Sequence, residues 1–385
     1  MITQSALQSF DRIETPFFYY DMDILRSTVD NFASTLKKYG VTAHYAVKAN
    51  SNDRILQTIS GAGIQAECAT GNEITLALAN GFPAKGIFFD GVAKTDKEII
   101  TALKAGIEIF NCESIQEIEV IDALAGGMGL KADIAVRVNP DVDAHTHKYI
   151  TTGTEEDKFG ISSGAFDQLF ATLSRCRNLN FAGIHMHAGS QITDMNVFAE
   201  LCKKATEFEK LFTERGFDVK LLNLGGGLGV DYVNPLENWM PNIEGLCNAI
   251  SKNLQLKPGQ TVHIEPGRAL VANCAHIISR VVYVKEGLKK KFAILDCGMH
   301  TLIRPALYQA HHEVENLSCK EPLEIYDVVG CVCESSDTFA RGFEGGAPHR
   351  GDFFAIHSAG AYGQVMNMKY LQRDLAPAVY SDDIK

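Results

Sequence analysis

Apolar strand-like runs alternate with amphipathic helix-like runs through most of the chain, from residue 22 to residue 267. Helical periodicity begins over Met22–Tyr39 and recurs over 51–62, 70–80, 95–105, 113–125, 164–175, 195–215 and 240–253. Runs rich in β-branched and aromatic residues predict strands at 43–48, 64–68, 86–90, 107–112, 132–138, 181–187, 219–224 and 261–265. Eight strands with intervening helices over about 240 residues are typical of a (β/α)8 barrel. We therefore predict an α/β fold with a TIM-type barrel over 22–267.

The remainder of the chain, 268–385, has little helical periodicity and many Gly and Pro turns. Strand-like runs at Ala275–Val284, Phe292–Leu295, Glu324–Val329 and Phe353–Ser358 predict a mainly β C-terminal domain. One more strand is predicted at Thr15–Asp21 and has no place in the barrel count. We expect residues 1–21 to join the β domain through that strand.

Composition narrows the class of protein further. The 385 residues are 46% hydrophobic and 22% charged, which is ordinary for a globular protein, and the formal net charge is −11. That charge argues against nucleic acid or an anionic membrane as partner. The first residues do not resemble a signal peptide and no run approaches a membrane span, so we expect a cytoplasmic protein. The ten cysteines form no Cys-x-x-Cys pair, which disfavours a disulfide framework or a structural zinc site.

Polar residues gather where the predicted strands end. Because active sites of (β/α)8 barrels form at the carboxyl ends of the strands, these residues are expected to share one rim. They are Lys48 after the first strand, Glu67 in the second, His185, His187 and Ser190 at the sixth, Gly225–Gly227 at the seventh and Glu265–Arg268 at the eighth. Lys48 is a candidate nucleophile, since desolvation favours a neutral amine. A lysine held in a structural salt bridge is the alternative.

The triple glycine predicts a phosphate site. Gly225, Gly226 and Gly227 allow backbone N–H groups to approach an anion closely. A dinucleotide fingerprint is disfavoured because the third glycine lies at the wrong spacing. The pairs His185-x-His187 and His145-x-His147 lack a third ligand of obvious spacing, so we expect no metal. An amine, a phosphate cradle and a carboxylate on one rim suit pyridoxal 5'-phosphate.

The chain resembles the barrel-type pyridoxal phosphate-dependent decarboxylases that act on basic amino acids. The similarity runs from about Thr15 to about Gly363. It rests on Tyr45-Ala46-Val47-Lys48-Ala49-Asn50, His185-Met186-His187-Ala188-Gly189-Ser190-Gln191, Gly225-Gly226-Gly227, Glu265-Pro266-Gly267-Arg268, Arg304-Pro305-Ala306-Leu307-Tyr308, Cys333-Glu334-Ser335-Ser336-Asp337 and Gly360-Ala361-Tyr362-Gly363. The segment after Tyr362 departs from the family pattern, which bears on substrate preference more than on cofactor use.

The resemblance implies a set of cofactor contacts. Lys48 would carry the cofactor as a Schiff base, His187 would stack on its ring, and Glu265 would keep the pyridine nitrogen protonated. Glu67 lies where the family has an acid near the cofactor, although aspartate is commoner there. The phosphate would be surrounded by Ser190, Gly225, Gly226, Gly227, Gly267, Arg268 and Tyr362.

The resemblance also implies the substrate and the reaction, the decarboxylation of meso-2,6-diaminopimelate to L-lysine. Arg304, Tyr308 and Glu334 would bind the distal amino-acid group, with Arg268 and Tyr362 also reaching substrate. Cys333 would donate the proton that replaces the lost carboxyl group, and it would come from the partner subunit of a homodimer with shared active sites. Alternatives for Arg304 and Cys333 are a surface salt bridge and a buried apolar residue, respectively.

Other activities remain open on the same scaffold. A decarboxylase of another dibasic substrate (carboxynorspermidine, ornithine or lysine) would not need the distal clamp. A non-catalytic regulatory homologue is disfavoured by the presence of Lys48, Glu265 and Cys333 together. A racemase would need a tyrosine opposite the lysine, and no motif for one is found.

Overall fold

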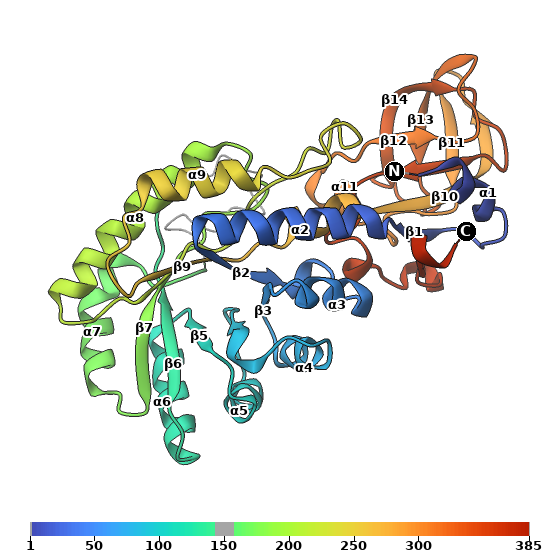
Figure 1. Ribbon diagram of the computed structural model, residues 1–385. Helices are drawn as coiled ribbons and strands as arrows, with labels where there is room; N and C mark the ends of the chain where they lie inside the picture. The colour runs from blue at the N-terminus through green and yellow to red at the C-terminus, as the bar shows by residue number, and fades with distance from the viewer. Residues whose placement is uncertain (1, 143–157, 385) are drawn as a thin grey trace. The chain divides into compact units, whose positions relative to one another are not determined.

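The computed structural model describes residues 2–142 and 158–384, which belong to two units (Figure 1). The first, which we call the barrel unit, comprises Val29–Gly229 and Asn242–Gly267. The second, which we call the β unit, comprises Met1–Thr28, Val230–Pro241 and Arg268–Lys385. Residues 230–241 thus group with the β unit, although sequence boundaries at 22 and 267 would place them in the barrel. None of the helices described combines the length and apolar character needed to cross a bilayer.

Eight parallel strands close the barrel in sequence order, which confirms the predicted fold class. Closure occurs where the first of them pairs with the last, with Ala43 opposite Ile264. Most residues of these strands are buried, which explains why they appear in the sequence as short, mainly apolar runs. The strands are β2 (Val41–Ala46), β3 (Gln65–Cys68), β4 (Ile87–Phe89), β5 (Ile109–Cys112), β6 (Ala132–Arg137), β7 (Leu179–His185), β8 (Leu221–Asn223) and β9 (Thr261–Ile264).

Six of the eight helices of this part of the chain begin at a polar residue that caps the helix, and each such cap marks the end of the preceding loop. Asn52 caps the helix after Lys48, and Thr95 and Glu98 form a reciprocal capping box. The helices are α2 (Met22–Tyr39), α3 (Asp53–Gly61), α4 (Gly71–Ala79), α5 (Asp96–Ala105), α6 (Ile115–Gly127), α7 (Phe166–Arg175), α8 (Met195–Glu214) and α9 (Ile243–Asn253).

The β unit contains an eight-stranded sheet with the path β12-β15-β10-β11-β13-β14, with β1 paired to β10 and β16. Its strands are β1 (Phe17–Tyr20), β10 (Ala275–Glu286), β11 (Lys291–Leu295), β12 (Val314–Asn316), β13 (Leu323–Val329), β14 (Thr338–Gly346), β15 (Phe353–Ile356) and β16 (Ala378–Tyr380). Three short helices belong to it, α1 (Gln4–Phe10), α10 (Arg268–Val271) and α11 (Arg304–Tyr308). The sequence pattern did not predict β12, β14 and β16, since two have only three residues and β14 is interrupted by glycines.

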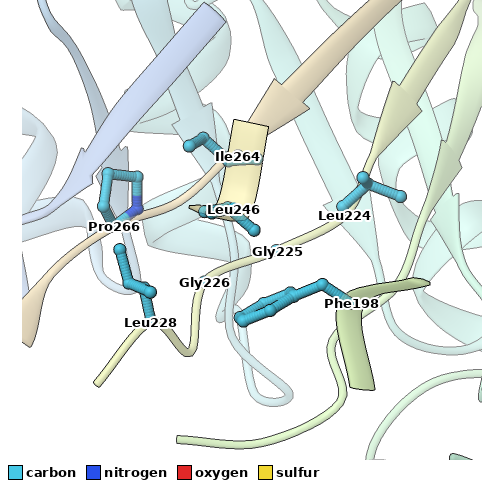
Figure 2. Close-up of a pocket in the computed structure, with 8 residues that line it drawn as sticks. All are labelled: Phe198, Leu224, Gly225, Gly226, Leu228, Leu246, Ile264 and Pro266. Carbon is cyan, nitrogen blue, oxygen red and sulfur yellow. The ribbon is translucent and has the colours of Figure 1, made fainter. Parts of the chain in front are cut away.

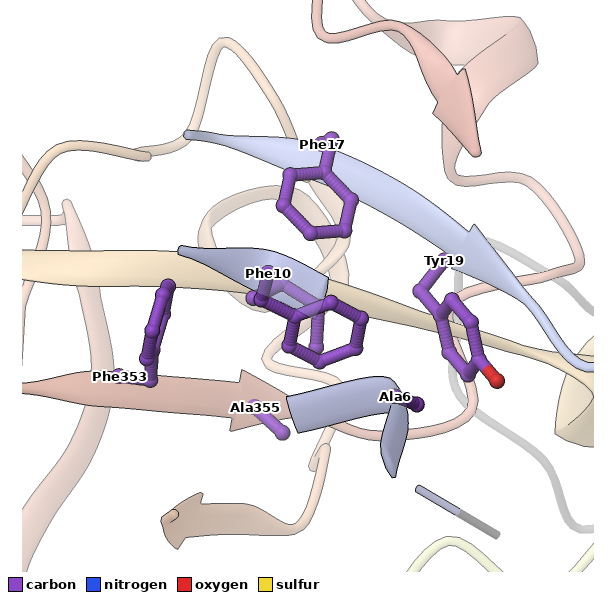
Figure 3. Close-up of a cluster of buried hydrophobic side chains, with 7 residues drawn as sticks. Ala6, Phe10, Phe17, Tyr19, Phe353 and Ala355 are labelled. Carbon is purple, nitrogen blue, oxygen red and sulfur yellow. The ribbon is translucent and has the colours of Figure 1, made fainter. Parts of the chain in front are cut away.

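An aromatic cluster anchors the N-terminal segment in the β unit (Figure 3). Phe10 of α1 lies edge-on to Phe17 and Tyr19 of β1, with centroid distances of 5.2 Å to each. Phe353 of β15 closes the same cluster. Such pairs contribute about 1 kcal/mol each beyond the area that they bury. The first strand is therefore held to the β unit by side-chain packing as well as by its ladder.

Two buried histidines lie in the barrel unit, on the first and last strands. His44 Nε2 lies 2.9 Å from His263 Nδ1, and the His44 ring stacks on Phe88 at 3.6 Å between centroids. Burial lowers the pKa of His44 to about 3, helped by its histidine neighbour, and burial lowers that of His263 to about 4. Both side chains are therefore neutral in the folded protein at neutral pH.

We expect acid to destabilise the barrel unit through this pair. Each histidine has a lower pKa in the folded than in the unfolded state. Its contribution to stability is complete when the pH lies above the pKa of the unfolded state. That contribution is lost as the pH falls toward the pKa of the folded state. From pH 8 to pH 5, each histidine should lower the free energy of unfolding by about 2 kcal/mol. Replacement His44→Gln should make the dependence of that free energy on pH shallower, as measured by urea unfolding between pH 8 and pH 5. An unchanged slope would contradict the assignment.

Candidate active site

Lys48 lies in a short 3-10 turn, Val47–Ala49, that directly follows β2. The turn is fixed by the Tyr45 hydroxyl, which donates to the Asn50 carbonyl over 2.9 Å. Gly267 lies against it so closely that an added Cβ would be 3.0 Å from the Cβ of Ala46. Only glycine allows this approach of the two chain segments without displacement. The lysine is thus carried on a rigid turn at the carboxyl end of a barrel strand.

The Lys48 amine is paired with Glu67 of β3. Its Nζ lies 2.9 and 2.8 Å from the two carboxylate oxygens. Glu67 is 1% exposed, whereas the Lys48 side chain is 46% exposed. Burial raises the pKa of Glu67 to about 8, against the opposing effect of the lysine charge. The salt bridge that was the alternative for Lys48 is therefore present, but it leaves the amine on the accessible side of the pair.

Glu265 is the anion of the site. Its Oε1 accepts hydrogen bonds from Asn223 Nδ2 at 2.6 Å and Asn111 Nδ2 at 3.2 Å, and its Oε2 lies 3.2 Å from His185 Nε2. Burial alone would raise the pKa of Glu265, but His185 and the Asn223 hydrogen bond lower it well below its usual range. Asp90 differs: burial and the Glu265 charge both raise its pKa. One ionised and one readily protonated carboxyl therefore lie together.

Sequence reasoning did not name three members of this network. Asn111 is the next-to-last residue of β5, Asn223 is the last residue of β8, and Asp90 directly follows β4. A polar residue that ends an apolar strand was the available signal, because these ends converge in a barrel. His185 was named as a polar residue of the rim and as part of a histidine pair considered for metal binding, but not as a partner of Glu265. The sequence therefore identified the carboxylate but not the groups that keep it ionised.

Asp90, His185 and Glu265 also form a group that could hold a metal ion. One potential ligand atom of each lies within 4.8 Å of the others, and it is the only such group of three among the described residues. The same three side chains form the charge contacts described above, in which His185 lies between Asp90 and Glu265. The other histidine pair considered from sequence, His145 and His147, lies outside the described residues.

The glycine turn after β8 packs closely against other parts of the barrel rim. Gly225 and Gly227 have φ of 67° and 108°, and an added Cβ on Gly226 would lie 2.3 Å from the Glu265 carbonyl oxygen. The Gly226 N–H donates to His187 Nδ1 over 3.1 Å. Burial lowers the pKa of His187 well below its usual value, so this ring is neutral and accepts that bond. The turn and the histidine are therefore fixed to each other.

An apolar pocket lies on one side of this turn (Figure 2). Its lining combines the glycine backbone with aliphatic and aromatic side chains and no charged group. The side chains are Phe198, Leu224, Leu228, Leu246, Ile264 and Pro266. An anion would lose its hydration there without compensation. The pocket is unsuited to a phosphate.

The remaining predicted residues lie in the β unit, apart from Ser190 of the barrel unit, which is partly buried. Arg268 donates to the Tyr232 hydroxyl over 2.8 Å, and its guanidinium carbon lies 5.0 Å from the centroid of Tyr362. Arg304 is only 5% exposed, so the surface salt bridge considered for it is wrong. Tyr308 ends α11 and is partly buried.

Two neighbours in sequence, Cys333 and Glu334, are exposed in the β unit. The Glu334 carboxylate accepts a hydrogen bond from the Tyr370 hydroxyl over 2.6 Å. The alternative of a buried, apolar Cys333 is therefore wrong for this chain. Six of the other nine cysteines are buried and all ten are free thiols.

Comparison with known proteins gives one consistent answer. Residues 23–272 match the family model described as "Pyridoxal-dependent decarboxylase, pyridoxal binding domain". Diaminopimelate decarboxylase of Bacteroides thetaiotaomicron is 46% identical over 379 residues, covering 98% of each chain. The enzyme of the same name from Aquifex aeolicus is 36% identical over 95% of this chain and 86% of its own.

A solved structure agrees with these relatives. It is that of diaminopimelate decarboxylase from Helicobacter pylori in complex with L-lysine. The two chains superpose with a TM-score of 0.92 at 35% identity, over 98% of this chain and 94% of the other. The similarity therefore extends over both units.

Proposed function

The chain belongs to the pyridoxal-dependent decarboxylase family, and from this premise we propose that it converts meso-2,6-diaminopimelate to L-lysine and CO2, the last step of lysine biosynthesis. It is a carboxy-lyase that uses pyridoxal 5'-phosphate. The main support for this substrate is the 46% identity to a diaminopimelate decarboxylase over 98% of the chain. A solved relative bound to L-lysine is consistent with that product.

The side chains of the barrel unit fit this cofactor. Lys48 presents an amine at the end of β2, and its counterion Glu67 is buried behind it. Glu265 is held ionised by its hydrogen bonds, as a partner of a protonated pyridine nitrogen must be. Gly225–Gly227 form a turn without side chains that packs closely against neighbouring backbone of the rim. When bound, the cofactor supplies an electron sink for the carbon that loses CO2.

We assign the cofactor contacts as follows. Lys48 would hold the cofactor through its amine, His187 would lie against the ring, and Glu265 would keep the ring nitrogen protonated. Glu67 pairs with the charged Lys48 amine and orients that side chain. The phosphate is bound by Ser190, Gly225, Gly226, Gly227, Gly267, Arg268 and Tyr362. Neutral His187 suits stacking because it adds no charge beside the ring.

We assign substrate recognition to residues of the β unit. Arg304 binds the distal carboxylate, aided by Tyr308, Arg268 and Tyr362, and Glu334 binds the distal ammonium. Guanidinium and carboxylate form paired, charge-assisted hydrogen bonds. The burial of Arg304 supports this role, since a buried cation requires an anionic partner to offset its lost hydration.

Cys333 is assigned as the group that delivers a proton to the carbon left by CO2. Its exposure in a single chain supports a contribution to the site of a second subunit. We therefore propose a homodimer with two shared active sites. Ten free thiols also favour a reducing compartment such as the cytoplasm, which cell fractionation followed by immunoblotting would test.

Turnover of candidate substrates tests the proposal. With cofactor added, the protein should release CO2 from meso-diaminopimelate and not at a comparable rate from L-lysine, L-ornithine or carboxynorspermidine. Replacement Arg304→Ala should lower kcat/KM for meso-diaminopimelate by about 100-fold, because a charge-assisted pair is lost. Arg350→Ala, at an exposed arginine of the same unit, serves as the control. Faster turnover of a substrate without a distal carboxylate would refute the proposal.

A further inference from the structure

A chain of hydrogen bonds connects two arginines of the β unit through residues that have no role so far. The Tyr232 hydroxyl accepts from Arg268 Nη1 at 2.8 Å and from Arg304 Nη1 at 3.0 Å. Arg304 Nη1 also lies 2.7 Å from His312 Nε2. His312 Nδ1 lies 2.8 Å from the carbonyl oxygen of His357, the residue after β15. The two guanidiniums are thus joined to each other and to the sheet backbone.

We propose that Tyr232 and His312 are positioning residues that hold Arg268 and Arg304 as a paired guanidinium site for one substrate carboxylate. This inference rests on the proposed function, because it takes the distal carboxylate of the substrate as the ligand. It adds to the separate roles given to Arg268 and Arg304 above, because here the spacing between the two guanidiniums determines which ligand binds.

Tyr232 makes the pairing of two cations possible. Two guanidiniums that share one neighbourhood repel each other, and here both are buried, at 6% and 5% exposure. The shared phenol oxygen accepts from both and lies between them. Burial would raise the pKa of Tyr232, but Arg268 and Arg304 lower it below its ordinary value. The Tyr232 ring also lies 4.8 Å from the Arg304 guanidinium carbon, which adds an attractive contact.

His312 fixes the orientation of Arg304. A guanidinium only donates, so the Nε2 that faces it must be the unprotonated nitrogen. The proton therefore lies on Nδ1 and is donated to the His357 carbonyl oxygen. Burial and the Arg304 charge keep the pKa of His312 well below its usual value, which maintains this neutral form. The histidine thus fixes the Arg304 guanidinium relative to the end of β15.

The hydrogen bonds of Arg304 leave the Nε and Nη2 edge of its guanidinium for a substrate carboxylate. Within the described ranges, the hydrogen bonds of Arg304 all involve Nη1. Nε and Nη2 remain as the parallel pair of donors that matches a carboxylate. A lone arginine could rotate about its side-chain torsions, whereas this one is held by two acceptors. Preorganisation of this kind increases affinity because less conformational entropy is lost on binding.

The experiment compares two ligands that differ in the carboxylate alone. L-Lysine keeps the distal carboxylate, and 1,5-diaminopentane has the same chain and amines without it. Tyr232→Phe removes the shared oxygen and keeps the ring. We expect L-lysine to bind the cofactor-loaded variant about tenfold more weakly, which corresponds to one lost charge-assisted hydrogen bond, and diaminopentane to bind as before. Calorimetry measures both affinities, and kinetics should show a raised KM for meso-diaminopimelate with kcat within about threefold.

Controls separate positioning from stability. Tyr326→Phe also removes a buried hydroxyl from the β unit, one that donates to the Gly346 carbonyl over 2.9 Å, and should leave both ligand affinities unchanged. His312→Gln retains an acceptor for Arg304 and should keep most of the L-lysine affinity, whereas His312→Leu should lose it. This pair decides the question if Tyr232→Phe does not fold. Equal weakening of both ligands, or no weakening of L-lysine, overturns the inference.

The result can be separated from the proposed function. If the unaltered protein does not decarboxylate meso-diaminopimelate but still binds L-lysine in a Tyr232-dependent way, the substrate is wrong and the paired site stands. If turnover occurs and Tyr232→Phe leaves L-lysine binding intact, the function stands and the paired site is refuted.

Discussion

Lys48→Ala is expected to abolish decarboxylation, with kcat/KM lower by at least about 10^4-fold. The variant loses the only group that we assign to bind the cofactor covalently. It also leaves Glu67 buried without the amine that lies 2.8 Å away. The purified variant should lack the absorbance band of the lysine-linked cofactor. Lys38→Ala, at an exposed lysine whose partner is Glu244, should keep both the band and the activity. A retained band in Lys48→Ala would show that another residue anchors the cofactor.

The same variant tests whether the active sites are shared between subunits. Cys333→Ala should be slow for a different reason, because it lacks the proton donor. If each site takes Lys48 from one subunit and Cys333 from the other, mixing the two inactive variants creates dimers with one intact site. Random exchange should then restore about a quarter of the unaltered activity. Activity that stays absent after exchange, verified by native mass spectrometry, would place both residues in the same subunit or remove Cys333 from the chemistry.

The barrel was predictable because short strands of mainly buried apolar residues alternate regularly with amphipathic helices. The rule that active sites form at the carboxyl ends then selected Lys48, Glu67 and Glu265 without knowledge of their contacts. Contacts between strands are not encoded locally. That Asn223 and Asn111 converge on one oxygen of Glu265 depends on the register of β5, β8 and β9. The sequence therefore identified the principal charges but not what sets their protonation.

The β unit was less predictable for a related reason. β14 contains three glycines, and its strand conformation comes from pairing with β13. Tyr232 follows the glycine turn in a segment without helical or strand periodicity, and Arg304 is 72 residues away from it in the chain. No local pattern marks such a pair. Arg304 itself was found through a motif, but its burial, which excludes a surface salt bridge, required the structure.

The two buried carboxyls near His185 provide the sharpest test of how the site is charged. Asn223 and His185 stabilise the ionised form of Glu265, whereas burial and the Glu265 charge favour the neutral form of Asp90. Replacement of Asp90 by its neutral amide should therefore lower kcat only a little, whereas the same replacement of Glu265 should lower it strongly. We expect Glu265→Gln to lower kcat by about 10^3-fold, because a preorganised charge that stabilises the transition state is removed.

Asp90→Asn is the matched comparison for Glu265→Gln, since each variant keeps the shape of the side chain and removes one acidic group. We expect its kcat to fall by no more than about tenfold, because the asparagine resembles the protonated acid that it replaces. Single-turnover decarboxylation of meso-diaminopimelate measures both losses free of product release. Cofactor absorbance confirms that each variant is loaded. Losses of similar size would mean that both carboxyls are ionised in the working enzyme, and a larger loss for Asp90→Asn would reverse the assignment of the anion.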